Sequence, residues 1–254
     1  MTVNSDLYEM IFKRKSFHLF RNVGDEIISS REIEKIKEIY KTFHPLYPDI
    51  KTEIKIVPAD ETTCNRGQQY CILLYSEKKE NYLQNIGYLG EQLDLYLVSQ
   101  NIGTLWFGIG KTNESSFEGL DFVIMIAISK IDDEAKFRKD MFKSKRKPVD
   151  EIWSGEPMAG ITDIIRFAPS ACNTQPWIVE RNESALNVYR YKRQGKRGIM
   201  PADKVSYYNQ IDIGIFLCFL ELCLEHNAVD FECTHFIDSG TDEEKTIVAT
   251  YSLL

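Results

Sequence analysis

The sequence lacks the short motifs that mark several common functions. It contains neither a G-x-G-x-x-G stretch nor a Walker loop, so a Rossmann or P-loop nucleotide site is not expected. Its four histidines have no motif partners, which argues against a nucleophilic triad. Its six cysteines show no CxxC and no Cys/His metal spacing, and we therefore expect no metal site.

Long apolar runs and excess positive charge are also scarce. No apolar run reaches membrane-spanning length, and the N-terminal stretch MTVNSDLYEM has no signal-peptide core. The net charge of −7 argues against a generic binder of nucleic acid or anionic membranes. Free cysteines inside apolar runs behave as small hydrophobes. We expect a reduced, soluble, cytoplasmic protein that binds neither nucleic acid nor membrane.

What remains is ordinary globular composition, with 254 residues of which 43% are hydrophobic and 27% charged. A chain of this length can form one large domain or two small ones. Hydrophobic spacing predicts helices at Ser30–Thr42 and Asn85–Asn101, and a short helix from Ile161 to Arg166. Gly103–Gly110 is interpreted as a turn. The predicted strands are Thr52–Val57, Tyr70–Tyr75, Phe122–Ile128 and the terminal Thr246–Leu254.

The pattern then starts again, which predicts a diverged internal duplication. Ile86-Gly87 and Ile213-Gly214 each open a long apolar helix, and the leucines that follow keep the same register. Phe43-His44-Pro45 stands where the second copy has Phe167-Ala168-Pro169. The terminal strand falls at the place of the strand Phe122–Ile128. We divide the chain into a first half, residues 1–153, and a second half, residues 154–254.

One stretch, Phe167–Trp177 (FAPSACNTQPW), is dense in residues with special chemistry. Pro169 stops a helix, Ser170 offers a hydroxyl, and Asn173 supplies an amide ahead of Trp177. On spacing alone, a helix-ending loop pinned by a buried tryptophan explains the stretch.

The wording A-P-S-A-x-N-x-Q-P-W resembles the signature loop of the FMN-dependent nitroreductase family, with every specified position intact. In that family the loop reaches across a dimer interface to a flavin held mainly by the other subunit. The resemblance implies that Pro169, Ser170, Ala171 and Asn173 contact FMN.

A second stretch, Arg14-Lys15-Ser16-Phe17-His18-Leu19-Phe20, resembles the family opening R-R-S-x-R-x-F. An arginine fork gives paired, charge-assisted hydrogen bonds to a phosphate. The resemblance implies Arg14, Lys15 and Ser16 for the FMN phosphate, and it places His18 where the family usually has a fixed cation. The alternative is a solvated basic helix end.

Two further motifs complete the resemblance. Lys143–Pro148 is similar to a basic tail that closes over the phosphate, which implies Lys145 and Arg146; the alternative is a solvated charged face. Gly103–Gly108 resembles a G-T-x-W-x-G turn whose amides approach the flavin, which implies Gly108. Asn65 stands where members often place an Asn on the flavin pyrimidine edge, although Asn-Arg-Gly is also an ordinary turn.

The resemblance implies an α+β nitroreductase-like fold, with mixed sheets flanked by helices. The motifs divide between the halves: Leu46 and Asp49 replace the first copy's Ser and Asn, and the second copy lacks a counterpart of the opening motif. We therefore expect a monomeric pseudo-dimer with one flavin site, and a homodimer stays open.

The implied activity is FMN-dependent and ping-pong, with NAD(P)H as reductant and a nitroaromatic, quinone or similar small aromatic acceptor. Because a flavin carries the hydride itself, no catalytic side chain is assigned. Two alternatives stay open: a flavin carrier or regulatory protein without productive turnover, and a structural relative that has lost FMN.

Overall fold

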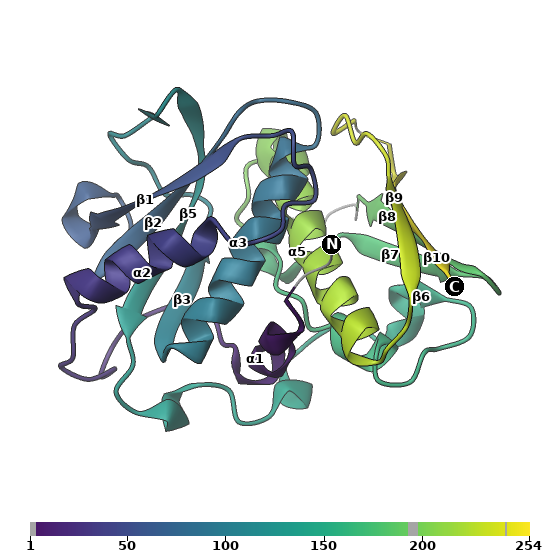
Figure 1. Cartoon of the computed structure of the whole chain (residues 1–254), viewed down its shortest axis with the longest axis horizontal. Coiled ribbons are helices and arrows are strands. Elements are labelled where there is room, and N and C mark those ends of the chain that lie inside the picture. The colour runs from purple at the N-terminus through teal and green to yellow at the C-terminus, as the bar shows by residue number, and fades with distance from the viewer. Residues whose placement is uncertain (1–3, 193–197, 242) are drawn as a thin grey trace.

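Two sheets lie on opposite sides of a pair of long helices (Figure 1). The structure, a computed structural model, describes residues 4–192, 198–241 and 243–254. The helices are α1 (Tyr8–Lys13), α2 (Ser30–Tyr40), α3 (Tyr82–Ser99), α4 (Thr162–Ile165) and α5 (Val205–His226). Short 3-10 turns lie at Ser5–Leu7, Ala59–Glu61, Glu134–Lys136, Met141–Lys143, Val149–Glu151, Ala171–Asn173 and Ala202–Lys204. The α+β class expected from the sequence is confirmed.

The first sheet comes from the first half of the chain. Its strands are β1 (Thr52–Pro58), β2 (Tyr70–Ser76), β3 (Ile102–Phe107), β4 (Ser116–Phe117) and β5 (Leu120–Lys130). The order is β1-β2-β5-β3 with antiparallel neighbours, and β4 pairs with β5. The sequence analysis interpreted the segment that forms β3 as part of a turn, and this is wrong. Gly103 suggested a break in the chain. However, the whole segment from Ile102 to Phe107 pairs with β5, and it contains β-branched and aromatic residues that favour strands.

The second sheet comes from the second half and from Trp153, the last residue of the first half. Its strands are β6 (Trp153–Ser154), β7 (Trp177–Arg181), β8 (Ala185–Tyr191), β9 (Phe231–His235) and β10 (Lys245–Leu253). The order is β6-β7-β8-β10-β9, with only the β6–β7 pair parallel among these described strands. The sequence analysis predicted β10 but missed β8 and β9.

The two sheets repeat one connectivity. In each half, two antiparallel strands precede a long helix, an edge strand follows, and the last strand inserts beside the second. The orders β1-β2-β5-β3 and β7-β8-β10-β9 therefore correspond strand by strand. This correspondence supports the predicted duplication, which stays a prediction, as does the division into halves.

Helices α3 and α5 cross at two glycines. A Cβ on Gly87 would lie 2.0 Å from the carbonyl oxygen of Ile211, and one on Gly214 would lie 1.9 Å from that of Gln84. Each glycine thus meets the residue three positions before the other glycine. Reciprocal contacts of this kind are what a two-fold arrangement of helices produces. Contrary to expectation, neither glycine opens its helix, since α5 begins at Val205.

Helix α5 also corrects the expectation that no apolar run could span a membrane. The helical stretch Ala202–His226 is long and apolar enough to do so by length and composition. However, 89% of its apolar window is buried inside the protein. Its apolar side chains belong to the core, which is continuous across both halves and includes Leu93, Trp177 and Phe219.

Candidate functional site

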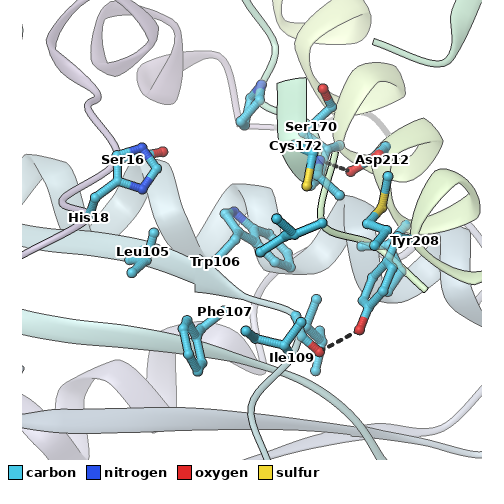
Figure 2. Close-up of a pocket in the computed structure, with 18 of the residues that line it drawn as sticks. Ser16, His18, Leu105, Trp106, Phe107, Ile109, Ser170, Cys172, Tyr208 and Asp212 are labelled. Atoms are coloured by element: carbon cyan, nitrogen blue, oxygen red, sulfur yellow. Dashed lines mark hydrogen bonds between the residues drawn. The ribbon is translucent and has the colours of Figure 1, made fainter. Parts of the chain in front are cut away.

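A cavity of about 260 Å³ lies between the two halves (Figure 2). The first half contributes Ser16, His18, Arg66 and the end of β3 from Leu105 to Ile109. The second half contributes the loop Pro169–Cys172, Ile199, Met200 and one face of α5. The opening motif, the end of the Gly103–Gly108 motif and the loop that begins at Pro169 therefore meet in one place.

The loop Phe167–Trp177 is anchored behind the cavity and presents its first residues to it. Trp177 is fully buried and stacks on Phe216 with ring centroids 4.8 Å apart. The Ser170 hydroxyl accepts a hydrogen bond from the Gln175 amide at 2.9 Å, which closes the loop on itself. Cys172, Asn173 and Gln175 adopt left-handed backbone angles, with φ of 50°, 55° and 51°. One end of this loop is therefore anchored by the buried Trp177, while its other end lines the cavity.

Asp212 of α5 fixes this loop from the other side. Its Oδ1 accepts a hydrogen bond from the Ala171 amide at 2.9 Å, drawn in Figure 2. Its Oδ2 is buried and has no hydrogen-bond partner in the part of the chain that the structure describes, while Asp212 itself lines the cavity. Burial raises the pKa of Asp212 to about 8, although the Ala171 amide opposes the shift. The carboxyl group therefore holds a proton at neutral pH and can donate it to a ligand.

The end of β3 forms the floor of the cavity. Trp106 lines it and donates from Nε1 to Asp94 Oδ2 at 3.0 Å. The Thr104 hydroxyl donates to Asp94 Oδ1 at 2.5 Å, so α3 holds this strand through one carboxylate. Gly108 lies against Tyr208, whose hydroxyl donates to the Gly108 carbonyl at 2.7 Å. A Cβ on Gly108 would meet the Tyr208 ring at 2.7 Å, so the absence of a side chain makes room for this contact.

Arg14, predicted to bind phosphate, has carboxylate partners that the sequence did not indicate. It is 2% exposed, and its Nε donates to Asp94 Oδ2 at 2.8 Å and lies 3.3 Å from Glu91 Oε1. Burial opposes the charged form, but the carboxylates of Asp94 and Glu91 outweigh burial and raise the pKa of Arg14. Arg14 thus supports β3 and α3, and its contact with a phosphate stays a prediction.

A cluster of arginines, which we call the arginine cluster, lies beside the cavity. It consists of Arg14, Arg138, Arg146 and Arg166. Burial and the charge of Arg14 lower the pKa of Arg138 to about 10. Burial and the other three arginines lower the pKa of Arg146 to about 10 as well.

The cluster has more positive charge than its protein surroundings neutralise. Among the described residues, Arg146 donates only to the carbonyls of Lys145 and Phe167, and its buried Nε has no hydrogen-bond partner. Within the described parts of the chain, no carboxylate forms an ion pair with Arg138, Arg146 or Arg166. Phe167 stands two residues before Pro169, so the cluster adjoins the cavity wall. Such a site is complementary to a multiply charged anion.

The structure brings half of the predicted residues to the cavity wall. Those that line it are Ser16, His18, Gly108, Pro169, Ser170 and Ala171. Asn173 and Lys145 instead join the two motifs, because the Asn173 side-chain amide donates to the Lys145 carbonyl at 3.2 Å.

The structure does not bring Lys15 or Asn65 to the cavity. Lys15 is exposed and donates to the Lys136 carbonyl at 2.8 Å, because it points to the opposite side of the chain from Arg14. Asn65 is exposed, and its neighbour Arg66 lines the cavity in its place. Contact of Lys15 and Asn65 with FMN stays a prediction.

Sequence reasoning missed Arg138, Asp212 and Tyr208. Arg138 precedes the basic motif Lys143–Pro148, and only residues of that motif were predicted to bind the phosphate. Asp212 directly precedes Ile213-Gly214, and Asn85 holds the corresponding place before Ile86-Gly87. A polar residue at that point of an otherwise apolar helix was the available signal.

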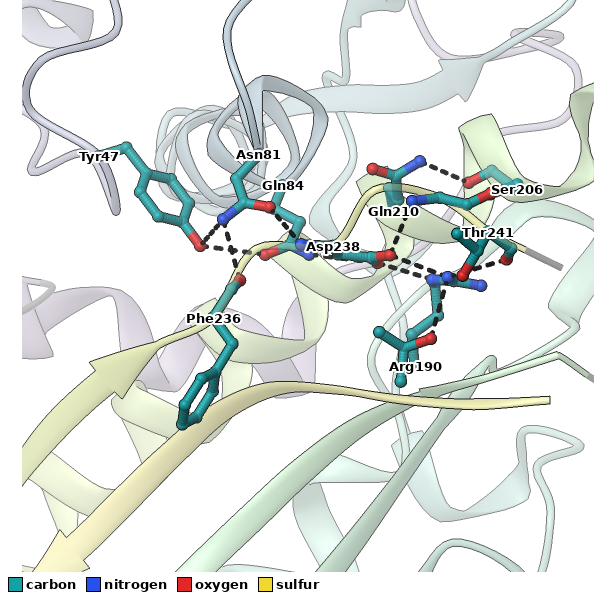
Figure 3. Close-up of polar contacts among 11 residues, drawn as sticks. Tyr47, Asn81, Gln84, Arg190, Ser206, Gln210, Phe236, Asp238 and Thr241 are labelled. Carbon is teal, nitrogen blue, oxygen red and sulfur yellow. Dashed lines mark hydrogen bonds and ion pairs between the residues drawn. The ribbon is translucent and has the colours of Figure 1, made fainter. Parts of the chain in front are cut away.

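The region of α3 that corresponds to the surroundings of Asp212 adjoins a network of polar contacts, drawn in Figure 3. Asn85 Oδ1 accepts from the Tyr47 amide at 3.1 Å, as Asp212 does from Ala171. There, however, the segment after β9 is tied to α3: the Asp238 amide donates to Asn81 Oδ1 at 2.9 Å. Arg190 donates to both carboxylate oxygens of Asp238, at 2.6 and 2.8 Å. This buried network lies beside an open surface pocket of about 600 Å³ that Tyr47 and Asn81 line.

The two-sheet fold and the cavity between its halves define a nitroreductase-like protein. A family model described as "Putative TM nitroreductase" matches residues 6–224. The match spans most of the chain, which therefore belongs to this nitroreductase family and is an oxidoreductase by class.

Comparison with solved structures shows the same fold. The chain is similar to a "putative nitroreductase" from Thermotoga maritima, with 18% identity, 97% of this chain and 93% of that chain covered, and a TM-score of 0.61. A nitroreductase family protein from Clostridium difficile shares 12% identity over 59% of this chain and 98% of its own, with a TM-score of 0.47. A "putative nitroreductase" from Desulfovibrio desulfuricans, solved in complex with FMN, shares 17% identity over 60% of this chain and 97% of its own, with a TM-score of 0.42. A search of curated proteins gave no match.

Proposed function

We propose that the chain is an FMN-dependent oxidoreductase that takes electrons from NAD(P)H and passes them to a nitroaromatic, quinone or similar acceptor. Family membership supports the oxidoreductase class, and the motifs that meet at the cavity support FMN. The observation that carries the proposal is the arginine cluster, with its unpartnered Arg146 Nε, at the edge of an aromatic cavity.

The residues present fit FMN at both of its chemical ends. A dianionic phosphate would neutralise the arginine cluster and give Arg146 Nε an acceptor. The cavity beside the cluster is walled by apolar and aromatic side chains such as Leu105, Trp106 and Ile215, as a flat ring system requires. Among polar groups, the Asp212 carboxyl and the Ser16 hydroxyl face the same space.

In the proposed reaction, the protein binds the cofactor and sets its orientation. When bound, FMN supplies the hydride chemistry. Arg138 and Arg146 would hold the phosphate, and Trp106, fixed by Asp94, would set the position of the ring system against β3. The protonated carboxyl of Asp212, a residue that lines the cavity, would donate a hydrogen bond or proton as negative charge develops on a ligand.

The test begins with the visible spectrum of the protein after incubation with FMN and removal of excess flavin. We expect a bound-flavin spectrum that NADH or NADPH bleaches without air, and that a nitroaromatic or quinone restores. A protein that binds FMN but is not bleached would be a flavin carrier. A protein that remains colourless in excess FMN would contradict the proposal altogether.

A further inference from the structure

A second chemically distinct cluster lies on the other side of α5, behind the edge strand β9. Cys233 and His235 are two residues apart on this strand, so their side chains share one face. The Cys233 Sγ lies 3.3 Å from the His235 Nε2. Glu221 of α5 faces both, and one ligand atom from each of the three residues lies within 4.8 Å of the others.

We propose that Glu221, Cys233 and His235 form a binding site for Zn²⁺ or a similar borderline-soft divalent cation. Thiolate, imidazole and carboxylate are the ligands that Zn²⁺ takes in proteins, and three protein ligands leave a fourth position for water. Zn–S and Zn–N bonds of about 2.3 and 2.0 Å at a tetrahedral angle place S and N about 3.5 Å apart. The observed 3.3 Å between Cys233 and His235 is close to that value.

Further contacts already orient the ligands. The Tyr88 and Tyr251 hydroxyls donate to the two oxygens of Glu221, at 2.5 and 2.8 Å. Each carboxylate oxygen keeps a second lone pair, so these bonds fix the group and leave it able to bind a cation. The His235 ring lies 5.3 Å from the Tyr47 ring, which limits its rotation.

Charge and access also suit a cation. Glu221 is 5% exposed and no lysine or arginine forms an ion pair with it in the described residues. Burial raises the pKa of the Cys233 thiol to about 12 and also that of Glu221, so a divalent cation would displace the thiol proton when it binds. His235 also lines a surface pocket of about 600 Å³ beside Tyr47 and Phe236, which offers a path for entry.

The proposal does not depend on FMN. Glu221, Cys233 and His235 do not line the cavity between the two halves. The sequence analysis expected no metal site because Cys-x-His alone is not a recognised spacing, and the third ligand comes from a different element.

The experiment measures metal per chain after chelator treatment and equilibrium dialysis against Zn²⁺, and in parallel against Co²⁺. We expect about one ion per chain, a thiolate-to-cobalt charge-transfer band, and a rise in melting temperature on adding Zn²⁺. Cys233→Ser and His235→Gln should each weaken binding by roughly 100-fold or more, since removing even an outer contact costs 10- to 100-fold. They should also abolish the thermal shift.

Cys172→Ser is the matched control, because this thiol is exposed in the other cavity and should leave metal binding unchanged. Cooperative unfolding of each variant without metal verifies that it folds. Absence of bound Zn²⁺ in the wild type, or equal binding by folded Cys233→Ser, would overturn the proposal.

Discussion

At the scale of single residues, members of the arginine cluster differ in whether they contribute mainly to ligand binding or to folding stability. Arg146 has carbonyl partners and an unpartnered Nε, whereas Arg14 is held between buried carboxylates. Removing Arg14 would leave Asp94 and Glu91 uncompensated, at a cost of about 3–5 kcal/mol in folding free energy. Arg146 is therefore the residue whose substitution reports on phosphate binding.

We predict that Arg146→Ala weakens FMN binding by roughly 10- to 100-fold, since a hydrogen bond to a charged group contributes about 1.5–3 kcal/mol. Riboflavin, which has no phosphate, should lose much less affinity. Flavin fluorescence titration measures both. Lys143→Ala is the control, because it removes one charge from the same segment at a side chain that is 83% exposed. Equal losses for FMN and riboflavin would remove Arg146 from the phosphate site.

Asp212 predicts a specific pH dependence of stability. Its pKa is raised by burial to about 8 from an ordinary value near 4, so the folded state binds the proton more tightly than the unfolded state. The stability that this group contributes is complete below about pH 4 and is lost as the pH rises through about 8. Asp212→Asn, whose amide resembles the protonated form, should make the melting temperature less dependent on pH across that window. Parallel melting curves against pH for both proteins would show that Asp212 does not hold the proton.

His18 predicts a pH effect on the flavin potential. It is exposed at the cavity wall, where the family usually has a fixed cation. Histidine is the side chain whose charge changes near neutrality, whereas lysine stays charged. The FMN midpoint potential should therefore fall more steeply with pH near neutrality in the wild type than in His18→Lys. Potentiometric titrations decide this, and parallel slopes would exclude His18 from influence on the flavin.

At the scale of elements, the crossing of α3 and α5 depends on Gly87 and Gly214. Helix propensity alone would make glycine-to-alanine substitutions stabilising by about 1 kcal/mol. Here the new Cβ would lie 2.0 or 1.9 Å from a carbonyl oxygen of the other helix, so the helices would have to separate. We predict that Gly87→Ala and Gly214→Ala each lower the unfolding free energy by at least about 2 kcal/mol. Chemical denaturation measures it, and a stabilised variant would show that the helices do not pack this closely.

The sequence predicted the elements whose local pattern is strong. Helix α2 has a capping box formed by Ser29 and Glu32, and β1, β2 and β5 are bounded by polar turns. Strands β3, β8 and β9 were missed because their stability comes from pairing with partners distant in sequence, such as β10 for β8. Within the site, motif residues that line the cavity could be recognised, but the carboxylates that hold Arg14 and Trp106 could not. Glu91 and Asp94 are visible in the sequence of the predicted helix, but their partners lie on other elements that local sequence patterns do not identify.

At the scale of the whole molecule, the two halves share one core. They differ in the residues that each contributes to the cavity between them. The cavity is lined by both halves, with the opening motif and β3 on one side and the loop Pro169–Cys172 on the other. In the region of α3 that corresponds to the surroundings of Asp212, Asn81 and Arg190 bind Asp238 in a buried network. We propose one flavin site per chain, built from residues of both halves. Cytoplasmic location and a monomeric state stay predictions.

The most direct test of this central claim is a titration of the chain with FMN, with the molar mass of the complex measured in solution. We expect saturation at one FMN per chain, at the mass of a single chain. Saturation at two FMN per chain, or binding only by a dimer, would contradict it.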